Sequence, residues 1–247
     1  MPMSTRSIIW FRRDLRICDH PALLAAIAES DEIVPVFILD PKLIKTAGSK
    51  RLAYLGQSLR LLDESLDNKL HVIAADQIDG LKQLQQKYGA SNVHISAEYE
   101  PYGAKRDEAI EKAGIKLIRT GSPYAVAPGR VLKPSDQTPY RVYTPFYRAW
   151  LAHGWRKPAE KPKNIAAVTP SKDERNFPDW QLPDGTVLTP AGELNAIERF
   201  KYFQKNGLDN YDEARNLAGI DGTSKMSAHL KWGEIHPRTL LAPLGLS

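Results

Sequence analysis

The regular alternation of short apolar segments with helical segments over the first 120 residues constrains the fold of this chain most strongly. Apolar runs at 7–11, 33–40, 71–75, 92–97 and 115–119 have the length and composition of buried strands. Helical patterns at 21–28, 52–66, 78–88 and 103–113 separate them, and the second has a leucine at every third or fourth position. This order predicts an α/β domain over residues 1–125, built on a doubly wound parallel five-stranded sheet.

A change in proline content marks the end of this pattern. Eleven prolines lie between Pro123 and Pro190, where we expect a linker over 126–190 that contains one helix near 146–152. A connection of this length is unusual inside one domain and normally separates two. Helical patterns resume at 194–204 and near Ser227. Residues 191–247 therefore predict the beginning of an all-α domain.

Composition indicates a soluble protein. The chain is 42% hydrophobic and 26% charged, and its apolar runs are shorter than the roughly 20 residues that cross a bilayer. The N-terminus lacks the order of segments found in a secretory signal, and Cys18, the single cysteine, permits no internal disulfide. We expect a cytoplasmic monomer with no membrane partner.

Positive charge is concentrated in the predicted linker. Eight basic residues lie between Arg130 and Lys163, opposed only by Asp136 and Glu160. Such a stretch suits a polyanion such as nucleic acid, but it is also typical of a solvated linker. Charge alone favours the linker interpretation.

The loop after the first strand is densely charged. It carries three arginines and two aspartates, namely Arg12, Arg13, Asp14, Arg16 and Asp19. Ligands of parallel sheets bind at the carboxyl ends of strands, so this loop is placed to bind an anion. The same residues can instead form a buried network of ion pairs, which requires that every charge has a partner. We favour the structural pairing.

Several motifs resemble one known family. The run from Trp10 to Arg16, followed by Asp19-His20-Pro21-Ala22-Leu23, is similar to the N-terminal signature of DNA photolyases and cryptochromes, in particular class I-type photolyases. Segments 35–41, 50–55, 98–107, 140–150, 211–216 and 219–235 also resemble the family. In these relatives the first segment is mainly architectural. We expect the aromatic residues of 140–150 to pack the linker onto both domains.

The resemblance implies an antenna chromophore, which is a reduced folate, a deazaflavin or a second flavin in different members. It places five residues of the strand-end loops near this chromophore: Phe37, Asp40, Arg51, Glu100 and Tyr102. The string Glu-Pro-Tyr-Gly at 100–103 is closer to deazaflavin-type members than to folate-type ones. Alternatively, Glu100 and Arg51 form a surface salt bridge.

The glycine turn at 222–227 contains three hydroxyl side chains and leads into a predicted helix. Backbone N–H groups and hydroxyls at such a position make a phosphate site, although a serine or threonine there is more often only a helix cap. The resemblance implies that this turn holds the pyrophosphate of FAD through Thr223, Ser224, Lys225, Met226 and Ser227, with Tyr211 beside it. Arg215 matches a family position that contacts the DNA backbone.

The family activity is light-dependent repair of cyclobutane pyrimidine dimers in UV-damaged DNA by electron transfer from reduced FAD, catalysed by deoxyribodipyrimidine photo-lyase. Since the cofactor performs the chemistry, we expect no catalytic acid, base or nucleophile and no metal ligands. Full-length members continue well beyond this chain, which we interpret as truncated within the FAD-binding domain and inactive alone. The alternatives are a cryptochrome-like blue-light photoreceptor and a chromophore-binding fragment without catalysis.

Overall fold

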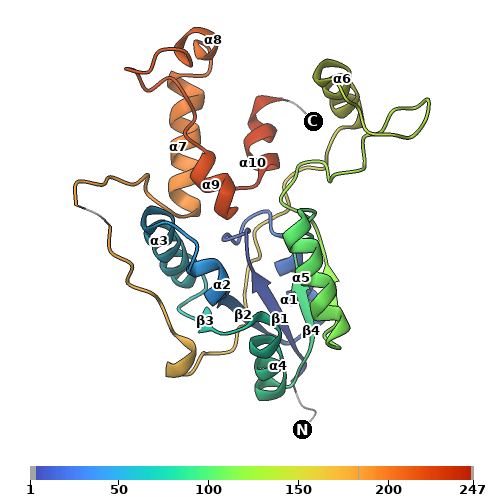
Figure 1. Ribbon diagram of the computed structural model, residues 1–247, viewed down its shortest axis with the longest axis vertical. Helices are drawn as coiled ribbons and strands as arrows, with labels where there is room; N and C mark the ends of the chain where they lie inside the picture. The colour runs from blue at the N-terminus through green and yellow to red at the C-terminus, as the bar shows by residue number, and fades with distance from the viewer. Residues whose placement is uncertain (1–3, 183, 246–247) are drawn as a thin grey trace.

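Five parallel strands form the centre of the computed structural model, which describes residues 4–182 and 184–245 (Figure 1). β1 (Arg6–Phe11) lies between β2 (Glu32–Leu39) and β4 (Ala90–Ile95), with β3 (His71–Ala74) and β5 (Leu117–Arg119) at the edges. The order β3-β2-β1-β4-β5 confirms the predicted doubly wound sheet. The predicted strand bounds differ from the observed ones by one or two residues, because hydrogen bonding, not apolarity, sets where a strand ends.

Helices cover both faces of this sheet. Alternate residues of β1 point to opposite faces, so Ile9 and Phe11 pack with residues of α1 (Pro21–Glu29) and α3 (Ser49–Ser65). Ile8 and Trp10 pack instead with α4 (Gln77–Tyr88) and α5 (Pro101–Lys112). Burial on both faces explains why the strands are apolar along their whole length.

Capping residues fix where the helices begin after the strands. Asp40 follows β2 directly and accepts a hydrogen bond from the backbone N–H of Lys42, which starts α2 (Pro41–Ile44). Asp76 caps α4 in the same way through the N–H of Ile78. The single turn of α2 was not among the predicted elements, although an aspartate followed by proline is a favourable helix start.

The proline-rich segment runs along one edge of the sheet on its way to the C-terminal helices (Figure 1). The backbone of Ile33 donates to Ala166 and accepts from Val168, each at 2.9 Å. Further on, the backbone N–H of Asn176 donates to the carbonyl of Val72 at 2.9 Å. This part of the segment therefore packs against β2 and β3.

Two helices lie within the proline-rich segment, α6 (Tyr143–His153) and the short 3-10 helix η1 (Lys172–Glu174). α6 stands away from the sheet in Figure 1, and none of its residues is buried. Its rings stack on one another, with centroids 5.7 Å apart for Tyr143 and Tyr147 and 6.4 Å apart for Tyr147 and Trp150. The expectation that these aromatics pack the linker onto both domains is therefore wrong within the described residues. Spacings of three and four residues place the rings on one helix face, where they contact each other.

The C-terminal part is helical, as predicted. It contains α7 (Glu193–Asn206), α8 (Tyr211–Ala214), α9 (Ser227–Trp232), α10 (Pro237–Leu241) and the 3-10 turn η2 (Ala242–Leu244). Phe200, Phe203, Met226 and Ile235 belong to a small core that joins these elements. No helix within 4–182 and 184–245 combines the length and apolarity that crossing a bilayer requires.

One buried carboxylate joins this helical part to the α/β part. Glu234 Oε1 accepts hydrogen bonds from Ser58 Oγ at 2.5 Å and Gly192 N at 2.7 Å. Its Oε2 accepts one from Tyr54 Oη at 2.7 Å and lies 2.6 Å from His229 Nδ1. Burial, followed by the negative charge of Glu234, raises the pKa of Tyr54, so this phenol stays protonated and donates. Glu234 is completely buried, and its four partners compensate for the loss of water.

We expect Glu234→Ala to lower the free energy of unfolding by about 3 kcal/mol, because it leaves several buried donors without an acceptor. Urea unfolding followed by circular dichroism measures this. The control is Glu64→Ala, an exposed position on α3, the helix that carries Tyr54 and Ser58, which should change stability by less than about 0.5 kcal/mol. Equal unfolding midpoints for the two variants would contradict the role given to Glu234.

Candidate functional site

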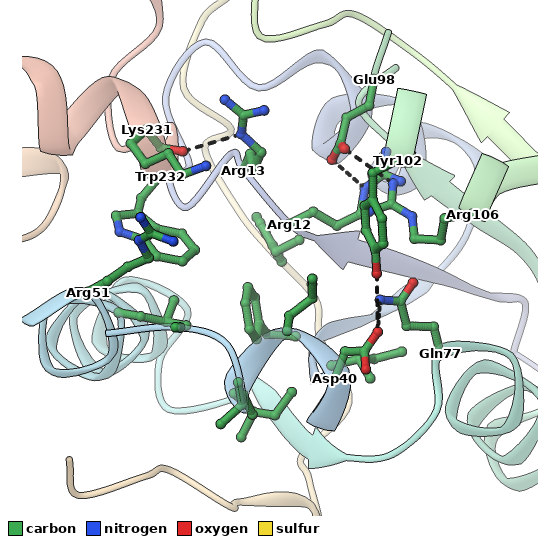
Figure 2. A pocket seen from close by; sticks show the side chains of 18 of the residues that line it. Arg12, Arg13, Asp40, Arg51, Gln77, Glu98, Tyr102, Arg106, Lys231 and Trp232 are labelled. Atoms are coloured by element: carbon green, nitrogen blue, oxygen red, sulfur yellow. Dashed lines mark hydrogen bonds and ion pairs between the residues drawn. The ribbon is translucent and has the colours of Figure 1, made fainter. Parts of the chain in front are cut away.

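A cavity of about 260 Å³ opens at the carboxyl ends of the strands. It lies where the strand order reverses around β1, which is the usual ligand position in open parallel sheets. Its walls come from the loops after β1, β2 and β4, from α3 and α5, and from α9 near the end of the chain (Figure 2). Segments that are distant in the sequence therefore meet in one site.

All five residues that the sequence placed near an antenna chromophore line this cavity: Phe37, Asp40, Arg51, Glu100 and Tyr102. Asp40 Oδ2 accepts hydrogen bonds from Gln77 Nε2 at 2.8 Å and from Tyr102 Oη at 3.3 Å (Figure 2). Burial, and then the negative charge of Asp40, raises the pKa of Tyr102, so the phenol remains a neutral donor. These three side chains form a polar group on one side of the cavity.

Positive side chains gather on the opposite side of the cavity, at the left of Figure 2. Glu100 forms an ion pair there, but its partner is Arg13 at 2.5 Å rather than Arg51. The hydrogen bond from Arg13 lowers the pKa of Glu100. Lys231 lies near Arg13 and Arg51, and burial together with their positive charges lowers its pKa. Because Lys231 has both Arg13 and Arg51 near it and Glu100 is the carboxylate paired there, this side carries an excess of positive charge that suits an anionic group.

One polar atom of the cavity wall, Gln77 Oε1, is buried without a hydrogen-bond partner in the described part of the chain. Arg12 Nε also makes no hydrogen bond there, but it lies 3.4 Å from a carboxylate oxygen of Glu98. A flat heteroaromatic ring with N–H and C=O groups along its edge offers the donors and acceptors that such atoms require. Phe37 and Leu55 add apolar surface to the same wall. The cavity therefore offers both polar and apolar contacts to a flat aromatic ligand.

The charged residues after β1 mostly find buried partners elsewhere in the chain, which agrees with the structural interpretation favoured from the sequence. Arg12 Nη1 lies 2.7 Å from Asp107, and Arg16 Nη1 donates to the Gly233 carbonyl at 2.9 Å. Asp14 is buried and accepts a hydrogen bond from the backbone N–H of Arg12 at 2.8 Å. Arg13 is the exception, because it lies at the cavity.

A glycine allows the end of α9 to approach the β1 loop closely. Gly233 has a φ of 65°, and a Cβ at this position would lie 1.9 Å from the carbonyl oxygen of Arg13. Just before it, the Trp232 carbonyl accepts a hydrogen bond from Leu15 N at 3.0 Å, and the Lys231 carbonyl accepts one from Arg13 Nε at 3.4 Å. Lys231 and Trp232 were not among the predicted cavity residues, and no local pattern could have placed them there.

The residues predicted to hold the flavin pyrophosphate lie in the loop between α8 and α9 and at the start of α9. The side chain of one arginine holds the backbone of this loop in place. Arg199 of α7 binds both oxygens of Asp221, at 2.6 and 2.7 Å. It also donates to the carbonyls of Thr223 at 2.6 Å and Ser224 at 3.1 Å. Arg199 was missed from the sequence, because it precedes the loop by a whole helix.

The end of this loop forms the start of α9. Lys225 has a φ of 54° and forms an ion pair with Asp221 at 2.9 Å, whereas Met226 is buried. Met226 occupies the N-cap position and no side chain caps α9, so the alternative that a hydroxyl of this string caps the helix is wrong. Ser227 begins α9 and is exposed. Hydroxyls and backbone N–H groups beside Lys225 fit a phosphate.

Tyr211 and Arg215 lie together beside this loop. The ring of Tyr211 packs edge-on against Phe203, with centroids 6.0 Å apart, and the Arg215 guanidinium lies 5.6 Å from the Tyr211 centroid. A Cβ on Gly222 would lie 2.6 Å from the Ala214 carbonyl oxygen, so the loop packs closely against α8. The structure therefore brings the predicted flavin and DNA residues into one region, apart from the strand-end cavity.

Comparison with known proteins finds one family. The family model described as DNA photolyase matches residues 7–164, which include the sheet and most of the cavity wall. A deoxyribodipyrimidine photo-lyase of Agrobacterium fabrum is 32% identical over 97% of this chain and 53% of its own length. An uncharacterized 31.6 kDa protein of Synechococcus sp. (strain PCC 6716) is 30% identical over 95% of this chain and 87% of its own length.

A solved structure shows the same likeness. A bacterial class III photolyase from Agrobacterium tumefaciens superimposes with a TM-score of 0.85 at 29% identity, over 98% of this chain and 53% of that one. The chain spans about half the length of the curated photo-lyases it matches. The sheet, the cavity and the loop before α9 all lie within the compared region.

The pH dependence of stability tests the charge arrangement in the cavity wall. Glu98 lies 3.4 Å from both Arg12 and Arg106, and its burial raises its pKa despite these cations. A carboxyl group with a raised pKa stabilises the fold below its unfolded pKa, and this contribution is lost as pH rises through the folded pKa.

We therefore expect Glu98→Gln to lose less stability than the unmodified chain as pH rises from about 4 to about 7. Urea midpoints measured at intervals across this range give the two profiles. Glu108→Gln, an exposed position on the α5 helix that follows Glu98, should leave the profile unchanged. Parallel profiles for Glu98→Gln and the unmodified chain would rule out the raised pKa.

Proposed function

Because this chain belongs to the DNA photolyase family, we propose that residues 1–125 are an antenna domain whose strand-end cavity binds a light-absorbing chromophore of the deazaflavin or reduced-folate type. The observation that carries the proposal is the convergence of Phe37, Asp40, Arg51, Glu100 and Tyr102 on one cavity. These residues come from three separate segments of the chain, around 37–40, at 51 and at 100–102.

The cavity residues divide the work of holding such a chromophore. Asp40, Gln77 and Tyr102 would offer acceptors and a donor to the polar edge of a ring, and Phe37 would offer it apolar surface. Arg51 and Lys231 attract an anionic tail. When bound, the chromophore supplies light absorption and passes its excitation on. The side chains fix its orientation and keep water from it.

We further propose that the loop from Thr223 to Ser227, with Tyr211, holds the pyrophosphate of FAD, and that Arg215 contacts the DNA backbone. Residues 126–190 then form the interdomain linker, and 191–247 begin the flavin domain. The activity proposed for the whole protein is light-dependent repair of cyclobutane pyrimidine dimers in UV-damaged DNA. The name deoxyribodipyrimidine photo-lyase of the similar proteins supports this activity.

A second candidate is a chromophore-binding protein that does not repair DNA. The observation that favours it is the 31.6 kDa relative, of which this chain covers 87% rather than about half. Both candidates bind a chromophore in the strand-end cavity. Only the photo-lyase also binds FAD and a pyrimidine dimer.

Fluorescence titration tests the cavity. We expect 5-deazariboflavin or methenyltetrahydrofolate to bind the 247 residues with one site per chain. Because the folate ends in carboxylates, we expect Arg51→Gln to weaken the binding of methenyltetrahydrofolate about tenfold, or about 1.4 kcal/mol. Lys50→Gln removes the same charge from the preceding, exposed position outside the cavity and should leave the affinity unchanged. Failure of both chromophores to bind would defeat the proposal.

For catalysis we expect the 247 residues alone to bind FAD weakly and to split no dimers, because they span about half the length of the photo-lyases they match. An absorption spectrum with added FAD measures the binding. Illumination of dimer-containing DNA with reduced FAD, compared with a dark sample, measures the splitting. Stoichiometric flavin together with light-dependent splitting would show that this chain suffices for repair.

A further inference from the structure

A tryptophan in the cavity wall lies beside two fixed positive charges. Trp10 is the residue before the end of β1, has only 2% of its surface exposed and lines the cavity. The Arg12 guanidinium carbon lies 4.9 Å from the centroid of its ring, and that of Arg106 lies 5.0 Å from it. Both distances are those of cation–π contacts.

Buried partners prevent these cations from moving away from the ring. Asp107 Oδ1 lies 2.7 Å from Arg12 Nη1 and 2.7 Å from Arg106 Nη2, so one carboxylate holds both. The Ser96 carbonyl accepts a further hydrogen bond from Arg12. The two arginine side chains are only 5% and 12% exposed, so water screens their charges weakly.

An indole next to a photoexcited heteroaromatic ring is a potential electron donor. It transfers one electron to the excited ring and becomes an indole radical cation, after which the electron returns and the excitation is lost as heat. Positive charges over the indole stabilise its neutral π system and disfavour the radical cation. Fixed guanidinium groups at Trp10 therefore make this donation harder.

We propose that Arg12 and Arg106 are positioning residues that suppress electron donation from Trp10 to a chromophore in the cavity, so that its excitation survives long enough to be passed on. This inference rests on the proposed function of the cavity. The proposed step, electron donation from Trp10 to the excited chromophore, does not follow from the family assignment. It gives the two guanidinium groups a role beyond packing against the indole.

The cavity wall contains a second indole, which the experiment must remove. Trp232 also lines the cavity, and within the described residues no cation–π contact involves it. All measurements are therefore made in a Trp232→Phe background, which leaves Trp10 as the one indole of the described wall. The probe is bound 5-deazariboflavin, and the measured quantity is its fluorescence lifetime.

We expect Arg106→Met to shorten this lifetime at least twofold, whereas Arg106→Lys, which keeps the charge, changes it little. Adding Trp10→Phe to Arg106→Met should restore the lifetime, because the donor is gone. Arg106→Gln is a second neutral variant in case the methionine disturbs folding. Lys105→Met is the matched control, since it removes an exposed charge from the adjacent position of α5.

The outcomes separate this inference from the function on which it rests. If Arg106→Met and Arg106→Gln both bind the probe with an unchanged lifetime, the inference is wrong while the cavity proposal stands. A shortened lifetime that persists after Trp10→Phe also overturns it, because another group then quenches. If 5-deazariboflavin does not bind at all, the inference is wrong, and binding of methenyltetrahydrofolate alone then decides the cavity proposal.

Discussion

The burial of Glu234 is the constraint on which the assembled structure depends. Its two carboxylate oxygens take hydrogen bonds from α3, from the residue before α7 and from α9, so three segments must meet before any of these groups is satisfied. Because the bonds are buried, a partial set leaves polar groups without water or partner. This requirement holds α9 against the α/β part, and only then do Lys231 and Trp232 complete the cavity wall.

Sequence patterns predicted the strands and helices, because burial and residue spacing within each short segment determine them. Apolar runs and leucine spacing were sufficient for the sheet, its order of elements and the helices around it, because each strand is buried on both faces. The five antenna candidates were named from the resemblance to photolyases, and the structure brings them together in one cavity. The single turn of α2 was missed because it is too short to show a periodicity.

Contacts between distant segments could not be predicted. The partner of Glu100 is Arg13, and nothing in either loop distinguishes Arg13 from Arg51 as the nearer cation. Arg199 shapes the loop before α9 from the preceding long helix. The stacked rings of α6 were expected to be core because aromatic residues usually are, yet no other element packs them out of solvent within the described residues. In each case the outcome depends on which side chain from a distant segment lies next to the residue. The spacing of residues along the sequence does not contain this information.

The proline-rich segment has a consequence for how copies of this chain behave toward one another. An exposed edge strand presents unpaired backbone groups on which another chain can add a strand and start aggregation. Here residues 166–168 bond to Ile33 of β2, ahead of the first residue of β2 that pairs with β3, and the Asn176 N–H bonds to β3 itself. At the opposite edge β5 is only three residues long. The proline-rich segment, whose sequence indicates only a connection between domains, therefore covers part of this sheet edge and hinders the addition of a strand from another chain.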